Sequence, residues 1–84
     1  MIESLVRARV LLGLNQAEAA KKAGITRVYY GEIERGAKRP LGAVVFILAS
    51  CLGLDARVLW NEIAEQIWMT EEGKWRKSGS GNTA

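Results

Sequence analysis

The sequence predicts an all-α fold of five short helices. Apolar residues recur at the spacing of three and four positions that is typical of a helix, and capping residues and glycines separate these stretches. No stretch alternates apolar and polar residues as a half-buried strand does. With 84 residues, the chain has room for one domain and little else.

The first two helices are expected over residues 2–12 and 16–23, separated by Gly13. Glycine suits the left-handed conformation in which many helices end. Asn15 is suited to the N-cap of the second helix, and Glu18, three residues on, completes a capping box. These residues therefore mark the end of one helix and the start of the next.

A third helix is expected over residues 27–35, between the capping residue Thr26 and Gly36. A fourth, over residues 43–52, follows a basic loop that contains Pro40. Five large apolar residues follow one another in this helix and cannot all face one small core. They are Val44, Val45, Phe46, Ile47 and Leu48. Some of them are expected to contact a partner.

The fifth helix is expected to begin after Asp55, a suitable N-cap, and its apolar pattern continues through Ile67 and Trp68 to Met69. Two interpretations remain open. The last turns either fold back on the protein's own core or form a dimer interface, which the large aromatic side chains favour. The residues assigned to a dimer interface are Val44, Ile47, Ile63, Ile67 and Trp68.

Residues 1–72 are expected to form the domain. Residues 73–84 are expected to be a flexible polar and basic tail, because they are short of apolar residues and end in a run rich in serine and glycine. Charged residues near the N-terminus interrupt any secretory signal, and the longest apolar run, residues 43–49, is too short to cross a bilayer. We expect a cytoplasmic protein with no membrane partner.

The composition argues against an enzyme. The chain has no histidine, which removes the commonest general base and the commonest zinc ligand. Its single cysteine, Cys51, lies in an apolar stretch, cannot build a zinc site alone, and is expected to be a buried, inert thiol. No glycine-rich phosphate loop is present. We therefore predict no catalytic residue, no metal and no cofactor.

The charge is distributed unevenly along the chain. The net charge is +3, and residues 1–40 carry eight Lys and Arg against four Asp and Glu. Residues 41–73 carry only Arg57 against five acidic residues. A basic front half is typical of a protein that binds a polyanion, and ordinary surface charge that maintains solubility is the alternative.

The second and third helices fit the helix-turn-helix pattern, in which two short helices meet across a turn that contains glycine. Gly24 falls in this turn, where a positive φ is expected. Ala20 lies where the two helices cross and a small side chain is required. The apolar contacts between them are expected from Ile25, Tyr30 and Ile33.

Residues 12–18, 24–26 and 33–36 resemble the lambda-repressor-like (Xre/Cro type) family, and within it the lambdoid phage repressors. The similarity covers residues 5–60. It implies a compact five-helix DNA-binding domain whose recognition helix, residues 27–35, enters the major groove. It also implies a homodimer that binds a near-palindromic operator in double-stranded DNA.

The resemblance implies DNA contacts at the start of the second helix, on the recognition helix and in the loop after it. These residues are Gln16, Thr26, Arg27, Val28, Tyr29, Glu32, Lys38 and Arg39. Gln16 resembles a family glutamine that binds a backbone phosphate and supports the reading side chains. Lys38 and Arg39 are expected to contact phosphates, which positions the domain without reading sequence.

The reading residues have suitable chemistry. Arg27 can donate two hydrogen bonds to guanine, Val28 can pack on a thymine methyl group, and Glu32 can accept from cytosine N4. Tyr29 can reach a phosphate or a base edge. The alternative for each is an ordinary solvated helix face.

Arg9 and Glu34 resemble a family ion pair that joins the first helix to the end of the third. The chain also departs from the family pattern: Ala19 replaces a leucine and Tyr30 replaces an isoleucine, which suggests a compensating exchange of volume. Gly31 within the recognition helix costs about 1 kcal/mol relative to alanine. Two explanations of this glycine remain open: close approach of the backbone to DNA or to another helix, or simple tolerance of the substitution.

The sequence therefore predicts a sequence-specific transcriptional regulator, a repressor or a repressor-activator of phage, prophage or mobile-element type. The alternative is an antitoxin that binds both DNA and a toxin protein. A protein-interaction module that has lost DNA binding is disfavoured by Arg27, Lys38 and Arg39.

Overall fold

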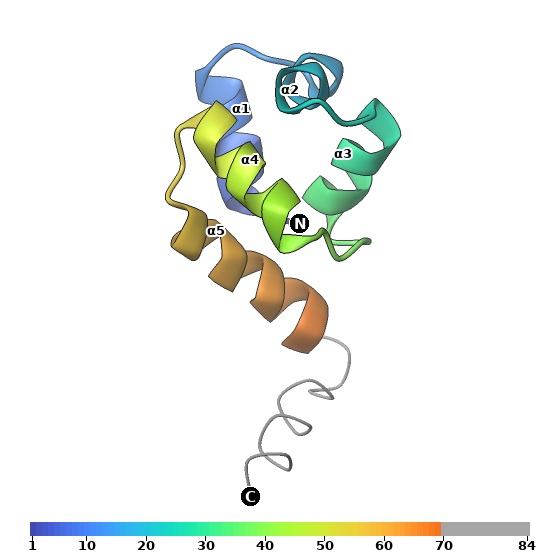
Figure 1. The fold of residues 1–84 in the computed structure, drawn as a ribbon, viewed down its shortest axis with the longest axis vertical. Helices are drawn as coiled ribbons and strands as arrows, with labels where there is room; N and C mark the ends of the chain where they lie inside the picture. Colours follow the sequence, from blue (N-terminus) through green and yellow to red (C-terminus); the bar gives the residue numbers. More distant parts are fainter. Residues whose placement is uncertain (70–84) are drawn as a thin grey trace, which may run out of the picture.

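The computed structural model describes the backbone of residues 1–69 and the side chains of residues 1–66. It contains the five helices that the sequence predicts, followed by a short π-helical segment (Figure 1). These elements are α1 (Glu3–Leu11), α2 (Gln16–Ala23), α3 (Arg27–Arg35), α4 (Gly42–Leu52), α5 (Ala56–Ile63) and the π-helix η1 (Ala64–Met69). The all-α prediction is confirmed. The tail predicted over residues 73–84 lies outside the described residues.

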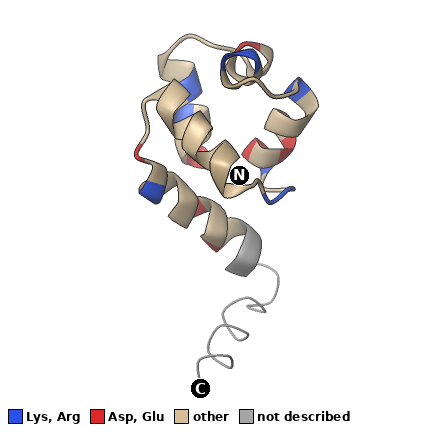
Figure 2. Cartoon of the chain, viewed as in Figure 1, with Lys and Arg blue, Asp and Glu red and all other residues tan. Residues whose placement is uncertain are grey.

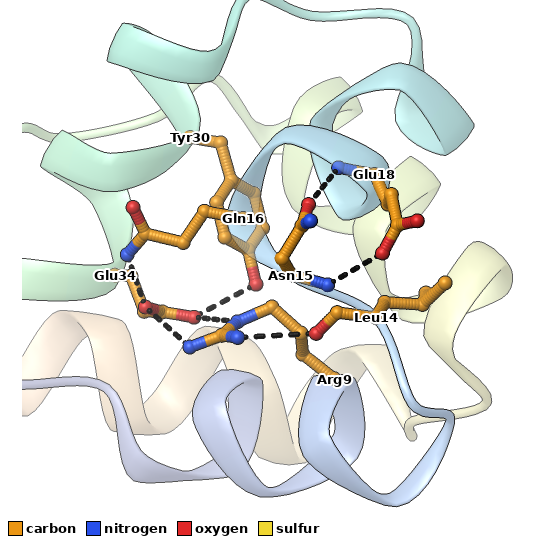
Figure 3. Close-up of polar contacts among 7 residues, drawn as sticks. All are labelled: Arg9, Leu14, Asn15, Gln16, Glu18, Tyr30 and Glu34. Atoms are coloured by element: carbon orange, nitrogen blue, oxygen red, sulfur yellow. Dashed lines mark hydrogen bonds and ion pairs between the residues drawn. The ribbon is translucent and has the colours of Figure 1, made fainter.

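Local chemistry fixes the bounds of α2 and α3, which agree with the sequence prediction. The Asn15 side chain accepts from the Glu18 backbone N–H, and the Glu18 carboxylate accepts from the Asn15 N–H, each at 2.8 Å (Figure 3). The Thr26 hydroxyl accepts from the Tyr29 N–H at 3.1 Å. Gly24 and Gly36 end the two helices with φ of +76° and +79°.

Helix α4 lies in the middle of the domain and contacts α1, α2 and α5 (Figure 1). Its buried residues join those of the other helices in one core. The core residues are Ile2, Leu5, Ala8, Ala19, Ala20, Ala23, Tyr30, Ile33, Val45, Leu48, Ala49, Leu52, Leu59 and Ile63. Ala19 and Tyr30 are both fully buried within it, as a compensating exchange of volume requires.

The expected dimer interface needs a correction. Ile63 is 1% exposed, because the apolar face of α5 packs against α1 and α4. Val44 is half-buried against the same core. The assignment of Ile63 to an interface was therefore wrong, while Ile47 stays exposed. The side chains of Ile67 and Trp68 lie outside the described residues.

The N-terminus of helix α1 is capped by a side chain of α5. Its own N-cap, Ile2, offers no side-chain acceptor. Instead, the Glu62 carboxylate of α5 accepts from the backbone N–H of Glu3 at 2.7 Å and from that of Ser4 at 3.3 Å. A carboxylate suits the N-terminus of a helix, where unpaired N–H groups and the helix dipole meet. This contact ties α5 to α1.

Three other findings concern the thiol, the membrane and the metal expectations. Cys51 is half-buried rather than buried as expected, and its thiol donates to the Lys22 carbonyl oxygen at 3.3 Å. Among the described residues, no helix is long and apolar enough to cross a membrane. Nor does any group of three metal-ligating side chains gather in this part of the chain.

Candidate nucleic-acid interface

Helices α2 and α3 meet across a tight turn. Gly24 adopts the left-handed conformation, and the N–H of Ile25 donates to the Ala20 carbonyl oxygen at 3.0 Å. Ala20 is almost fully buried at this crossing, where a larger side chain would push the helices apart. The expected roles of Gly24 and Ala20 therefore agree with the geometry.

Helix α3 has a buried face and an exposed face. Tyr30, Ile33 and Glu34 point into the domain. Arg27 and Val28 are exposed at its first turn, and the Val28 side chain is 66% exposed. An apolar side chain this exposed at the start of a helix is suited to contact a base methyl group.

A cluster of polar side chains holds the buried face of α3 in place (Figure 3). The Arg9 Nε donates to Glu34 Oε2 at 2.9 Å, and Arg9 Nη2 donates to Oε1 at 3.3 Å. The Tyr30 hydroxyl donates to Oε2 at 2.9 Å, and the Gln16 amide Nε2 donates to Oε1 at 2.7 Å. We call these four residues, Arg9, Gln16, Tyr30 and Glu34, the Glu34 cluster.

The Glu34 cluster joins three helices and the loop between two of them. Arg9 belongs to α1 and Gln16 to α2, and both bind the same carboxylate of α3. Arg9 Nη1 also donates to the Leu14 carbonyl oxygen at 3.1 Å, in the loop between α1 and α2. The Arg9–Glu34 pair expected from the sequence is thus present, and its partners Tyr30 and Leu14 are contacts that the sequence reasoning missed.

The cluster also sets the ionisation of its members. Burial by itself raises the pKa of the Glu34 carboxyl, but hydrogen bonds from Arg9, Gln16 and Tyr30 outweigh burial and hold this pKa below its ordinary value. The hydrogen bond to Glu34 raises the pKa of the Arg9 guanidinium. Burial, reinforced by the hydrogen bond to Glu34, raises the pKa of the Tyr30 hydroxyl. Near neutral pH the cluster therefore holds an ionised pair and a neutral phenol.

The expected phosphate contacts lie at the end of α3. Lys38 Nζ lies 3.6 Å from Glu32 Oε1, and both side chains are partly exposed. Arg39 follows in the same exposed loop. Figure 2 shows basic residues at the start of α3 and in the loop after it, on the same side of the domain. The Glu32–Lys38 contact was not predicted.

One exposed residue of α3 was missed. Arg35 lies seven positions after Val28 and three after Glu32, so it belongs to the same exposed face. The spacing of Arg35 from Val28 and Glu32 indicates this face in the sequence. The sequence prediction included Arg35 only in the family motif of residues 33–36 and not among the DNA contacts. Its guanidinium makes no hydrogen bond or ion pair with the part of the chain that the structure describes.

The two-helix unit, its glycine turn and its exposed basic face define a helix-turn-helix DNA-binding domain. A family model described as helix-turn-helix matches residues 5–59, which is more than half of the chain. The chain therefore belongs to this family, which is of the lambda-repressor-like (Xre) type, and is a DNA-binding regulator. No curated protein and no solved structure matches the chain.

The Glu34 cluster predicts how stability depends on pH. The folded-state pKa of Glu34 is below its ordinary 4.5, so the folded protein binds fewer protons than the unfolded chain in this range. The contribution of Glu34 to stability is therefore complete above pH 4.5 and is lost as the pH falls through the folded-state pKa.

Chemical denaturation of the Glu34→Gln variant at neutral pH is expected to show a free energy of unfolding lower by about 3–5 kcal/mol, because Arg9 loses its counter-ion.

The same variant supplies the test of the pH dependence. Its free energy of unfolding should fall less between pH 6 and pH 3 than that of the unaltered protein. Glu65→Gln makes the same change at an exposed position and should alter neither quantity appreciably. Parallel pH profiles for the unaltered protein and Glu34→Gln would show that Glu34 does not supply this dependence.

Proposed function

We propose that the chain is a transcriptional repressor that binds a near-palindromic operator as a homodimer. The observation that carries the proposal is the division of α3 into two faces. The Glu34 cluster fixes the buried face, and Arg27 and Val28 stand exposed at the first turn. A recognition helix reads base edges with its N-terminal residues, which are the exposed ones here.

The other expected contacts fit this orientation. Thr26 is exposed at the N-terminus of α3, and Tyr29 is half-buried beside it. Lys38 and Arg39 are exposed in the loop after the other end of the helix and are suited to contact the DNA backbone. Glu32 is held by Lys38, so reading of a cytosine by Glu32 requires that this contact open or be shared.

Gln16 has a more restricted role than the family resemblance implies. Its amide nitrogen already donates to Glu34, which leaves one N–H for a phosphate. We infer that Gln16 mainly orients α2 against α3 and that any phosphate contact uses the second hydrogen. Arg9 likewise binds Glu34 and the Leu14 carbonyl oxygen and acts as a structural residue.

Selection of binding sites from a pool of random duplexes tests the proposed function. The purified protein is expected to enrich an inverted repeat with half-sites about one DNA turn apart, roughly 34 Å. Arg27→Ala should lower affinity for that duplex by about 1–3 kcal/mol and relax the preference at one base pair per half-site. Lys22→Ala, which removes a positive charge from the exposed side of α2, serves as the matched control for charge. Failure to enrich any sequence would contradict the proposal.

The proposed dimer uses an apolar surface of α4 and α5. Phe46 is 64% exposed, and it borders a shallow pocket of about 290 Å³ with Trp60. The other large apolar side chains exposed on these helices or just before α4 are Leu41, Ile47 and Val58. We call Phe46 and Trp60, which line the same pocket, the α4–α5 apolar surface. Burial of each such side chain is worth roughly 1.5–3 kcal/mol, so a few per subunit offset the cost of association.

A single charge should disrupt this dimer. Phe46→Glu is expected to give a folded monomer, because the side chain is exposed, with much weaker binding to a symmetric duplex. Val10→Glu makes a comparable change at a 60% exposed position on α1 and should leave the dimer intact. Sedimentation velocity at micromolar concentration checks both variants. A Phe46→Glu protein that remains dimeric would place the interface elsewhere.

An antitoxin is the second candidate, and one observation favours it. Helix α1 and the residue after it expose Val10, Leu11 and Leu12. Leu11 and Leu12 border a pocket of about 300 Å³ that Leu52 and Leu54 also line. This second apolar surface is available to a partner protein such as a toxin. Co-expression with the product of the adjacent gene tests it: relief of a growth arrest would support an antitoxin, and no effect would leave the repressor.

A further inference from the structure

Gly31 lies in the middle of α3, on the side that Val28 and Arg35 share, and yet it is buried. Two side chains approach it. A Cβ atom placed on Gly31 would lie 3.5 Å from Gln16 Oε1 and 3.6 Å from Arg35 Nη1. Gly31 is not among the glycines with a positive φ; its missing side chain leaves room on the helix surface that Gln16 and Arg35 both border.

The Gln16 side chain has a defined orientation at this place. The Glu34 carboxylate only accepts hydrogen bonds, so the Gln16 amide nitrogen must face it, and the amide oxygen is turned toward Gly31. This oxygen and Arg35 Nη1 both lie near the position that a Gly31 side chain would fill. The Glu34 cluster thus extends, through Gln16, to the exposed face of α3.

The Arg35 side chain runs back along its own helix. It starts in the last residue of α3, and its Nη1 lies beside Gly31, one turn nearer the N-terminus. Helical side chains lean in this direction, and the missing side chain at position 31 keeps the path open. The guanidinium therefore lies over the middle of the recognition helix, with no hydrogen bond or ion pair from the described residues to occupy it.

We infer that Arg35 is a specificity-determining residue that donates to the O6 and N7 atoms of a guanine in the major groove. The inference rests on the proposed function, because it requires α3 to lie in that groove. Arginine makes this bidentate contact more often than any other side chain, and its planar fork needs to be held in place for both bonds to form. Gly31 provides the space in which the guanidinium lies along the helix.

The experiment compares variants on the duplex that the unaltered protein selects from a random pool. Arg35→Ala is expected to bind that duplex at least about tenfold more weakly and to reselect sites that are degenerate at one G·C pair of each half-site. Gly31→Leu, which keeps Arg35 but fills its space, should show the same relaxation at the same base pair. Circular dichroism checks that each variant is folded.

Two controls separate reading from general effects. Arg7→Ala removes the same charge from the exposed side of α1 and should keep the selected sequence unchanged. Gly31→Ala should also keep it, because a methyl group there makes only ordinary contacts. The inference is overturned if Arg35→Ala still selects the original sequence. It is also overturned if Arg35→Ala binds the selected duplex and unrelated duplexes more weakly by the same factor, because Arg35 would then contact phosphate only. If the unaltered protein selects no sequence, the proposed function fails, and the inference fails with it.

Discussion

The hydrogen bonds from Arg9, Gln16 and Tyr30 converge on the Glu34 carboxylate, which is 3% exposed. A buried charge is costly unless a counter-ion and hydrogen-bond donors surround it, and these three residues provide both. Because the donors come from α1, α2 and α3, satisfying this one carboxylate sets the relative positions of three helices. No buried polar side-chain atom in the described part of the chain is left without a hydrogen bond. Replacement of any one donor leaves the others facing an incompletely solvated charge.

This constraint connects the interior to the DNA-binding face. A recognition helix needs a fixed angle to its supporting helix, because base contacts depend on positions within a fraction of an ångström. Gln16 contacts both the interior and the side of α3 that carries Val28 and Arg35. Its amide nitrogen binds Glu34, and its amide oxygen lies near Gly31. Helix α5 is linked to the same unit by a separate contact, the Glu62 cap on α1. The surface proposed for dimerisation is thus joined to the reading helix through α1.

Much of this arrangement was predictable because its determinants are local. Asn15 and Thr26 defined α2 and α3 to the residue, since a cap acts within one turn. Contacts between distant segments were harder to predict. The periodicity of α5 showed that Ile63 lies on an apolar face but not that the protein's own core covers this face. The Glu62 cap joins residues 59 positions apart, and no local pattern indicates it. The path of Arg35 over Gly31 depends on a side-chain conformation, which spacing alone does not determine.

A double-mutant cycle on the Glu34 cluster tests the central claim most directly. Gln16→Ala and Tyr30→Phe each remove one donor to the same carboxylate, from different helices. The free energies of unfolding of the two single variants and the double variant are measured by chemical denaturation. If Glu34 couples the helices, the two effects are non-additive, with an interaction energy of about 0.5–3 kcal/mol. Additive effects would show that the donors act independently, and that the carboxylate does not join the helices into one unit.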